Sequence, residues 1–223
     1  MTLPQGPGIL RLAPPRRSAI AAVPQTMTDS KWKSALVQAF FETQSFRHDP
    51  EQGFTLASGL VSPFYVDCRM LMADPRARRL VAEAAWERLR GRPFTSIGGL
   101  ELGAISIATT ISDYAFATDS SPVWQTFVVR KQVKDHGTGK RIEGGVRAGD
   151  RAVIVDDVLT SGGSLLKAVS AAREAGLEVT DALVIVDRKE QDGRAHVEAA
   201  GLTLISLLTI DDLVAWASAS ARR

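Results

Sequence analysis

The chain has 223 residues, of which 27 are basic, 25 are acidic and 45% are hydrophobic. This length fits one domain with a short appendage, and the near-average composition excludes collagen-like, coiled-coil and wholly disordered proteins. A single cysteine excludes an internal disulfide framework and a cysteine-rich zinc ribbon, and it fits a reducing cytosol. Residues 1–30 carry three arginines against one aspartate, so residues 31–223 are neutral overall and give no support for nucleic-acid binding.

The N-terminal segment differs in character from the rest of the chain. Residues 1–26 hold five prolines and no acidic residue. We therefore expect residues 1–29 to be a disordered extension, with Met27 as an alternative start, and a folded domain over residues 30–223. A transit peptide is the alternative, although prolines disfavour its amphipathic helix. No apolar run approaches the roughly 18–20 residues that a membrane helix needs, so we expect no membrane partner.

The first predicted elements are an amphipathic helix over residues 31–46 and a short hairpin over residues 54–67. A second helix should begin at Asp74-Pro75, where the aspartate caps the helix and the proline takes its first position. It should run to about Arg90, because Gly91 is a typical helix terminator.

From residue 95 onward, predicted strands and helices alternate, which indicates an α/β fold with a mainly parallel sheet. Ligands of such sheets bind beyond the carboxyl ends of the strands. The expected strands cover residues 95–98, 123–129, 152–155, 179–186 and 203–209. The expected helices cover residues 101–117, 162–175, 191–200 and 211–219, and residues 131–147 are polar and glycine-rich.

The segment Arg151–Ser164 (RAVIVDDVLTSGGS) joins an apolar strand to a helix through two acids and a run of small residues. The first N–H groups of a helix lack partners inside it, and the helix dipole adds partial positive charge there. Small hydroxylated residues and glycines let a phosphate approach this backbone closely. The residues predicted to bind a phosphate monoester are Thr160, Ser161, Gly162, Gly163 and Ser164.

Asp156 and Asp157 follow this apolar strand directly and would repel a phosphate. They require a polyhydroxyl group or a cation, and the 2′- and 3′-hydroxyls of a pentose 5′-phosphate meet that requirement. The alternative is a capped strand–helix turn without a ligand, in which two adjacent carboxylates would be costly to bury unpartnered.

A cationic segment, Arg130–Gly139 (RKQVKDHGTG), precedes this strand. Residues 130–147 hold six lysines and arginines, one histidine and only two acids. A mobile cationic flap suits a reaction that releases a highly charged anion and excludes water. Lys131 and Lys134 supply point charge, Arg130 a bidentate fork, and His136 a hydrogen bond or proton for a departing phosphate oxygen. Taken alone, the segment could equally be a solvated loop or a nucleic-acid patch.

Together these segments resemble the type I phosphoribosyltransferases. Residues 151–164 are similar to the ribose-phosphate motif of that family, and the Arg-Lys-x-x-Lys-x-His-Gly pattern of residues 130–137 resembles the flexible loop of its orotate-specific members. The likeness extends over about residues 31–223 and also rests on LASGLVSPFYVDCR (56–69), GGLELGAISIA (98–108), VDRKE (186–190) and TIDDL (209–213). It implies a mainly parallel central sheet flanked by helices, with a small hood of helix and hairpin at roughly 30–72 and a core at 73–223.

The resemblance implies transfer of the phosphoribosyl group from 5-phosphoribosyl 1-pyrophosphate (PRPP) to orotate, giving orotidine 5′-monophosphate and pyrophosphate in pyrimidine biosynthesis. It implies Mg²⁺ carried by PRPP, with no direct side-chain ligands, and a cytoplasmic homodimer with shared active sites and no nucleic-acid partner. The implied catalytic residues are Lys131, Lys134, His136, Asp156 and Asp157. The implied PRPP-binding residues are Arg130, Lys131, Lys134, His136, Asp156, Asp157, Val158, Leu159, Thr160, Ser161, Gly162, Gly163 and Ser164. The implied orotate-binding residues are Tyr65, Val66, Thr160 and Arg188.

The sequence departs from the family pattern at several positions. Ala57 stands where a lysine is common, Glu101-Leu102 where some members have Tyr-Lys, and Leu100 where proline is frequent. The changes at residues 57 and 102 each remove a possible cation for the pyrophosphate.

Two rival functions follow from the same residues. A phosphoribosyltransferase for a purine or uracil would need a different base pocket, and Arg188 disfavours it. A non-enzymatic regulator, sensing a nucleotide or binding nucleic acid, should lack the basic flap residues or carry an added domain. Cys68 is expected to be a small core residue, because no Cys/His pairing is evident.

Overall fold

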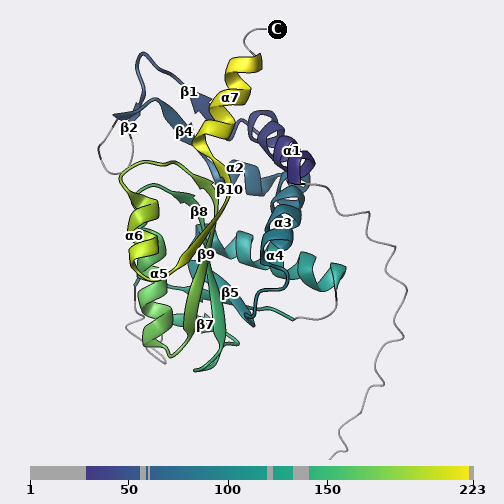
Figure 1. Cartoon of the computed structure of the whole chain (residues 1–223), viewed down its shortest axis with the longest axis vertical. Helices are drawn as coiled ribbons and strands as arrows, with labels where there is room; N and C mark the ends of the chain where they lie inside the picture. The colour runs from purple at the N-terminus through teal and green to yellow at the C-terminus, as the bar shows by residue number, and fades with distance from the viewer. Residues whose placement is uncertain (1–28, 56–58, 60, 120–122, 133–140, 221–223) are drawn as a thin grey trace, which may run out of the picture.

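The structure is a computed structural model that describes residues 29–55, 59, 61–119, 123–132 and 141–220. Figure 1 shows a twisted central sheet with helices on both faces and a smaller group of helices and short strands at one end. The expected α/β architecture with an N-terminal hood is therefore confirmed. Residues 1–28 and most of the expected flap lie outside the described residues.

The central sheet has six strands in the order β10-β9-β8-β5-β6-β7. Every neighbouring pair is parallel except β6 and β7, which are antiparallel. Parallel neighbours require crossover helices, which the alternating sequence supplies. The strands are β5 (Ser96–Leu100), β6 (Gln125–Val129), β7 (Ile142–Gly144), β8 (Arg151–Leu159), β9 (Glu178–Asp187) and β10 (Thr203–Thr209).

Helices cover the two faces of the sheet and create two separate apolar cores. In β8, Val153 and Val155 belong to one core and Ile154 to the other, because successive strand residues point to opposite faces. This explains why the β8 sequence is continuously apolar rather than alternating. The first core is covered by α3 (Pro75–Leu89) and α4 (Gly103–Thr118), and the second by α5 (Gly163–Glu174) and α6 (Gly193–Ala199).

The hood packs on the first core at the end of the sheet where the parallel strands finish (Figure 1). Trp32, Leu36 and Phe40 of its first helix are at most 1% exposed, so burial of this apolar face holds the helix in place. The elements of this region are α1 (Asp29–Glu42), β1 (Phe46–His48), β2 (Phe54–Thr55), β3 (Val61–Ser62), β4 (Phe64–Val66), α2 (Cys68–Ala73) and the C-terminal α7 (Ile210–Ser220).

The hood also differs from expectation in three details. The helix predicted to reach residue 46 ends at Glu42, because Gln44 adopts a positive φ of 55° and Phe46 enters a strand. The predicted hairpin is divided between two pairs, in which β2 pairs with β3 while β4 pairs with the more distant β1. The short helix α2 was not anticipated. Among the described residues, the structure contains no helix of the length and apolarity needed to cross a membrane.

Candidate active site

The predicted phosphate-binding turn lies between β8 and α5. Strand β8 runs four residues further than expected and pairs with β9 up to Leu159. Gly162 then adopts a φ of 81°, a conformation that favours glycine, and α5 begins at the next residue. A Cβ on Gly193 would lie 2.1 Å from the Thr160 carbonyl oxygen, so the start of α6 packs directly behind the turn. The N–H groups at the start of α5 thus fall where an anion is expected to bind.

Asp156 and Asp157 lie within the last part of β8 and are partly buried. Each carboxylate accepts the next backbone N–H: Asp157 N donates to Asp156 Oδ1 (3.0 Å), and Val158 N donates to Asp157 Oδ1 (2.8 Å). Burial, reinforced by the neighbouring charge of Asp157, raises the pKa of Asp156 to about 7, while the charge of Lys131 acts in the opposite direction. The Asp156 carboxyl therefore changes its charge near neutral pH.

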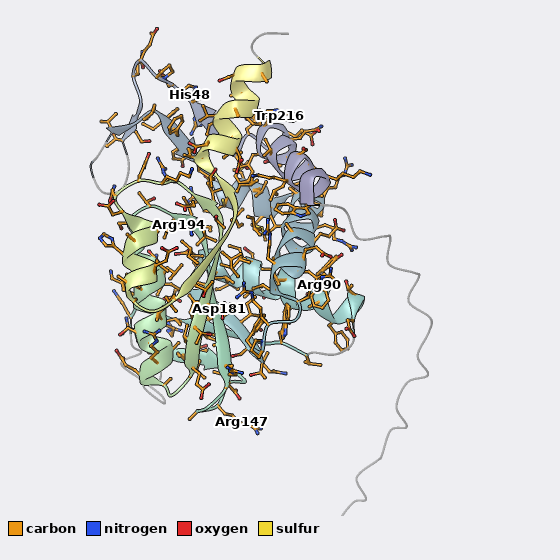
Figure 2. The ribbon with its side chains drawn as sticks, viewed as in Figure 1. His48, Arg90, Arg147, Asp181, Arg194 and Trp216 are labelled. Atoms are coloured by element: carbon orange, nitrogen blue, oxygen red, sulfur yellow. The ribbon has the colours of Figure 1, made fainter. Side chains whose placement is uncertain are left out.

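Two adjoining cavities open at this end of the sheet. Arg147, which precedes the start of β8, lies at the opposite end of the molecule (Figure 2). The β5-side cavity, about 470 Å³, is lined among others by Leu102, Gly103, Lys131 and Asp157. The β9-side cavity, about 420 Å³, is lined among others by Val66, Asp157, Thr160, Ser161 and Arg188. The residues that line both are Cys68, Arg69 and Asp157. Such a position agrees with the rule for parallel sheets.

The described part of the cationic segment lies at the root of the connection between β6 and β7. Lys131 lines the β5-side cavity, and its backbone N–H donates to the Glu101 carboxylate (2.7 Å). Arg130 is instead paired with Glu143 (2.9 Å) and is not among the residues that line either cavity. Lys134 and His136 lie outside the described residues. Of the two predicted flap side chains that the structure describes, Lys131 therefore lines a cavity beside Asp157 and Arg130 does not.

Three of the four residues predicted to bind orotate line the same cavity. Val66, Thr160 and Arg188 line the β9-side cavity together. Tyr65 is not among the residues that line this cavity, but its hydroxyl donates to Oδ2 of Asp67, which does line it (3.5 Å). The Tyr65 ring packs 5.7 Å from the Phe54 ring and 4.7 Å from the Arg47 guanidinium.

The structure adds residues that sequence reasoning missed. Arg69 lines both cavities and is held by the Asp67 carboxylate, which accepts its Nε and Nη2 hydrogens (2.8 Å each). The same carboxylate caps α2, and its bonds to Arg69 hold the pKa of Asp67 below its usual value. The Asp-x-Arg spacing at the start of α2 was the available signal. Cys68 is confirmed as a core residue, and burial raises the pKa of its thiol.

The described side chains around the cavities offer few ligands for a divalent cation such as Mg²⁺. Among the described residues, no three His, Cys, Asp or Glu side chains gather closely enough to hold a metal ion by themselves. Of the two adjacent carboxylates, Asp157 lines both cavities, whereas Asp156 is not among the lining residues of either. Mg²⁺ is commonly bound by one or two carboxylates together with substrate phosphates while it keeps several waters. This set fits an ion that enters with a phosphorylated substrate.

Comparisons with known proteins agree with this geometry. A model of the phosphoribosyl transferase domain matches residues 68–206. The chain therefore belongs to the phosphoribosyltransferase family. The orotate phosphoribosyltransferase of Pyrococcus furiosus is 40% identical over 170 residues, covering 75% of this chain and 89% of that protein. That of Aquifex aeolicus is 40% identical over 171 residues, covering 77% and 92%. Within the family, the chain belongs to the orotate phosphoribosyltransferases.

Solved structures give the same result. The Mycobacterium tuberculosis orotate phosphoribosyltransferase in complex with Fe(III) dicitrate superposes with a TM-score of 0.68 at 31% identity, covering 82% of this chain and 98% of that one. The same enzyme in complex with PRPP superposes with a TM-score of 0.64 at 28% identity, covering 82% and 92%.

Proposed function

We propose that the protein transfers the 5-phosphoribosyl group of PRPP to orotate, forming orotidine 5′-monophosphate and pyrophosphate. One observation carries this proposal: Thr160 and Ser161 of the turn, Asp157 of the carboxylate pair and Arg188 line one cavity. A phosphate site, a hydroxyl-binding acid and a carboxylate-binding cation are what the two substrates jointly require.

The turn and the carboxylate pair position PRPP. The backbone N–H groups at the start of α5 and the Thr160–Ser164 hydroxyls receive the 5′-phosphate, with Val158 and Leu159 supplying backbone at the end of β8. Asp156 and Asp157 hold the ribose hydroxyls, and their negative charge stabilises the positive charge that develops on the ribose as the C1–O bond breaks. Because this set leaves no need for a covalent nucleophile, catalysis consists of positioning and electrostatics.

The leaving pyrophosphate is neutralised on the β5 side. Lys131 lines the cavity on that side. In the proposal, Lys134, His136 and Arg130 complete the cationic set. Mg²⁺ supplies further charge neutralisation when it is bound with the phosphates. Closure of this set over the cavity would exclude water, so that orotate rather than water reaches C1.

Orotate occupies the β9-side cavity in this proposal. Arg188 receives its carboxylate, and Thr160 and the backbone around Tyr65 and Val66 contact the ring. The ring nitrogen bonds to C1 as the C1–O bond to pyrophosphate breaks, and the proton of the nitrogen passes to an oxygen of the departing pyrophosphate. The proposal also includes a cytoplasmic homodimer, in which Arg130, Lys134 and His136 of one subunit cover the site of the other. Residues 30–223 form the catalytic domain, with residues 1–29 as an extension.

The first test follows the loss of orotate absorbance with purified protein, PRPP and Mg²⁺. Turnover that requires Mg²⁺ and collapses in Lys134→Ala, but persists in the control Lys167→Ala on the exposed side of α5, would support the proposal. Absence of turnover with orotate, uracil, hypoxanthine and adenine alike would overturn the enzymatic function. Turnover with only one of the other bases would overturn the choice of orotate.

The shared site has its own test. Mixing Lys134→Ala protein with Asp157→Asn protein should restore part of the activity, because one site of each heterodimer then has both groups intact. Absence of any recovery, with heterodimers shown to form, would contradict a shared site.

A further inference from the structure

Arg188 is fixed by an unusually complete set of partners. Its side chain is only 4% exposed. Nε donates to Glu190 Oε2 (3.0 Å), and Nη2 donates to Ser62 Oγ (2.7 Å), to the Phe64 carbonyl (3.1 Å) and to Glu190 Oε1 (3.3 Å). The Ser62 hydroxyl in turn donates to Glu190 Oε1 (2.9 Å). A guanidinium held at two of its three nitrogens has its plane defined.

The arrangement leaves one edge of Arg188 for a ligand. Among the described residues, the structure shows an acceptor for Nε and for Nη2 but none for Nη1, and Arg188 lines the β9-side cavity. Glu190 also neutralises a charge that would be costly to bury alone. The cavity therefore contains a neutral ion pair whose remaining nitrogen has two unused donors.

We propose that Ser62 and Glu190 are positioning residues that determine the preference for a base bearing a carboxylate. This inference rests on the proposed orotate transfer. By engaging Nε and Nη2, the two residues keep Arg188 from turning to satisfy Nη1 elsewhere. A base with a carboxylate satisfies Nη1, whereas uracil leaves it buried and unpaired. Sites built to hydrogen-bond a substrate group discriminate strongly against analogues that lack the group, for this reason.

The same contacts join the hood to the core. Ser62 belongs to β3 and Phe64 to β4, whereas Arg188 and Glu190 follow β9. Arg188 is 126 residues from Ser62 and 124 residues from Phe64 along the chain. Each residue that orients the guanidinium therefore also fixes the distance between the hairpin and the end of β9. The orotate site depends on this junction, while the phosphate turn lies on the core alone.

Two charge-conserving variants test the proposal. Ser62→Ala removes the bridging hydroxyl, and Glu190→Asp shortens the carboxylate so that it cannot reach both nitrogens. The KM for orotate should rise about tenfold in Glu190→Asp and several-fold in Ser62→Ala, while the KM for PRPP stays within about twofold. The inhibition constant of uracil should stay unchanged, because uracil has no carboxylate for Nη1. The matched control is Glu198→Asp, whose carboxylate pairs with Arg194 on the exposed side of α6 (3.1 Å).

The outcomes separate three explanations. A selective rise in the KM for orotate supports the positioning role. If the KM values for orotate and PRPP rise together, or if only the melting temperature falls, the residues are merely structural and the inference is overturned. Should Glu190→Asp fail to fold, Ser62→Ala alone decides. Lack of orotate turnover in the unmodified protein would instead refute the proposed function.

Discussion

Replacing Asp156 with asparagine should stabilise the protein at neutral and alkaline pH while destroying its proposed activity. Burial beside Asp157 raises the pKa of Asp156 from 3.8 to about 7, so the folded protein holds an unfavourable charge above that pH. Asparagine has nearly the same shape and carries no charge. The unfavourable charge therefore opposes folding, while the proposed function assigns this carboxylate to the ribose hydroxyls.

The magnitude follows from linkage between protonation and folding. A difference of one pKa unit corresponds to about 1.36 kcal/mol, so the shift of Asp156 amounts to roughly 4 kcal/mol. Because the pKa is higher in the folded state, the stability that protonation contributes is fully present below pH 3.8 and is lost as the pH rises to about 7. The stability advantage of Asp156→Asn should thus shrink by roughly 3 kcal/mol between pH 8 and pH 5.

Urea unfolding of the unmodified protein and of Asp156→Asn at pH 8, 7, 6 and 5, without substrates or phosphate, measures the difference between their free energies of unfolding directly. The control is Asp113→Asn, which makes the same change of side chain at an exposed position of α4, away from the residues that line the two cavities. The reasoning is refuted if this difference in unfolding free energy stays constant from pH 8 to pH 5, or if Asp156→Asn is less stable than the unmodified protein at pH 8.

Three further predictions concern single residues. Gly193→Ala should raise the KM for PRPP about tenfold or more, because its Cβ would lie 2.1 Å from the Thr160 carbonyl oxygen and displace the phosphate turn; steady-state kinetics measure this. Asp74→Ala should lower the melting temperature by a few degrees without changing either KM, because Asp74 accepts the Arg76 and Ala77 N–H groups at the start of α3. Arg69→Gln should raise the KM for PRPP several-fold, with unchanged thermal unfolding, because its guanidinium lies between the two cavities.

The parts of the fold that were predictable are those specified by neighbouring residues. The cap and first position of α3 are Asp74 and Pro75, as expected, because both effects act within one helical turn. The motif of residues 151–164 likewise identifies a buried strand, a turn and a helix start, and the structure places them so. Its acids nevertheless lie inside β8 rather than beyond it, because pairing with β9 continues to Leu159.

The unpredicted parts depend on contacts between distant residues. Strand β1 exists because Phe46 lies opposite Val66, and a three-residue strand has too few positions to show an alternating pattern. The hydrogen bonds around Arg188 also join residues that are far apart in the sequence. Glu190 is close in sequence, but Ser62 meets it only after the hood has packed onto the core, so no local pattern could reveal the pair.

The charges around the β5-side cavity bear on the departure from the family pattern at Leu102. Leu102 is 76% exposed beside the β5-side cavity, where some family members have a lysine. In this chain, Arg69 lines the same cavity from the opposite element, α2, and Asp67 orients its guanidinium through two bonds. A cation need only be near the departing pyrophosphate to stabilise its charge, and its place in the sequence is immaterial. Loss of the lysine position is therefore compatible with the reaction, because Arg69 and Lys131 still provide positive charge on that side.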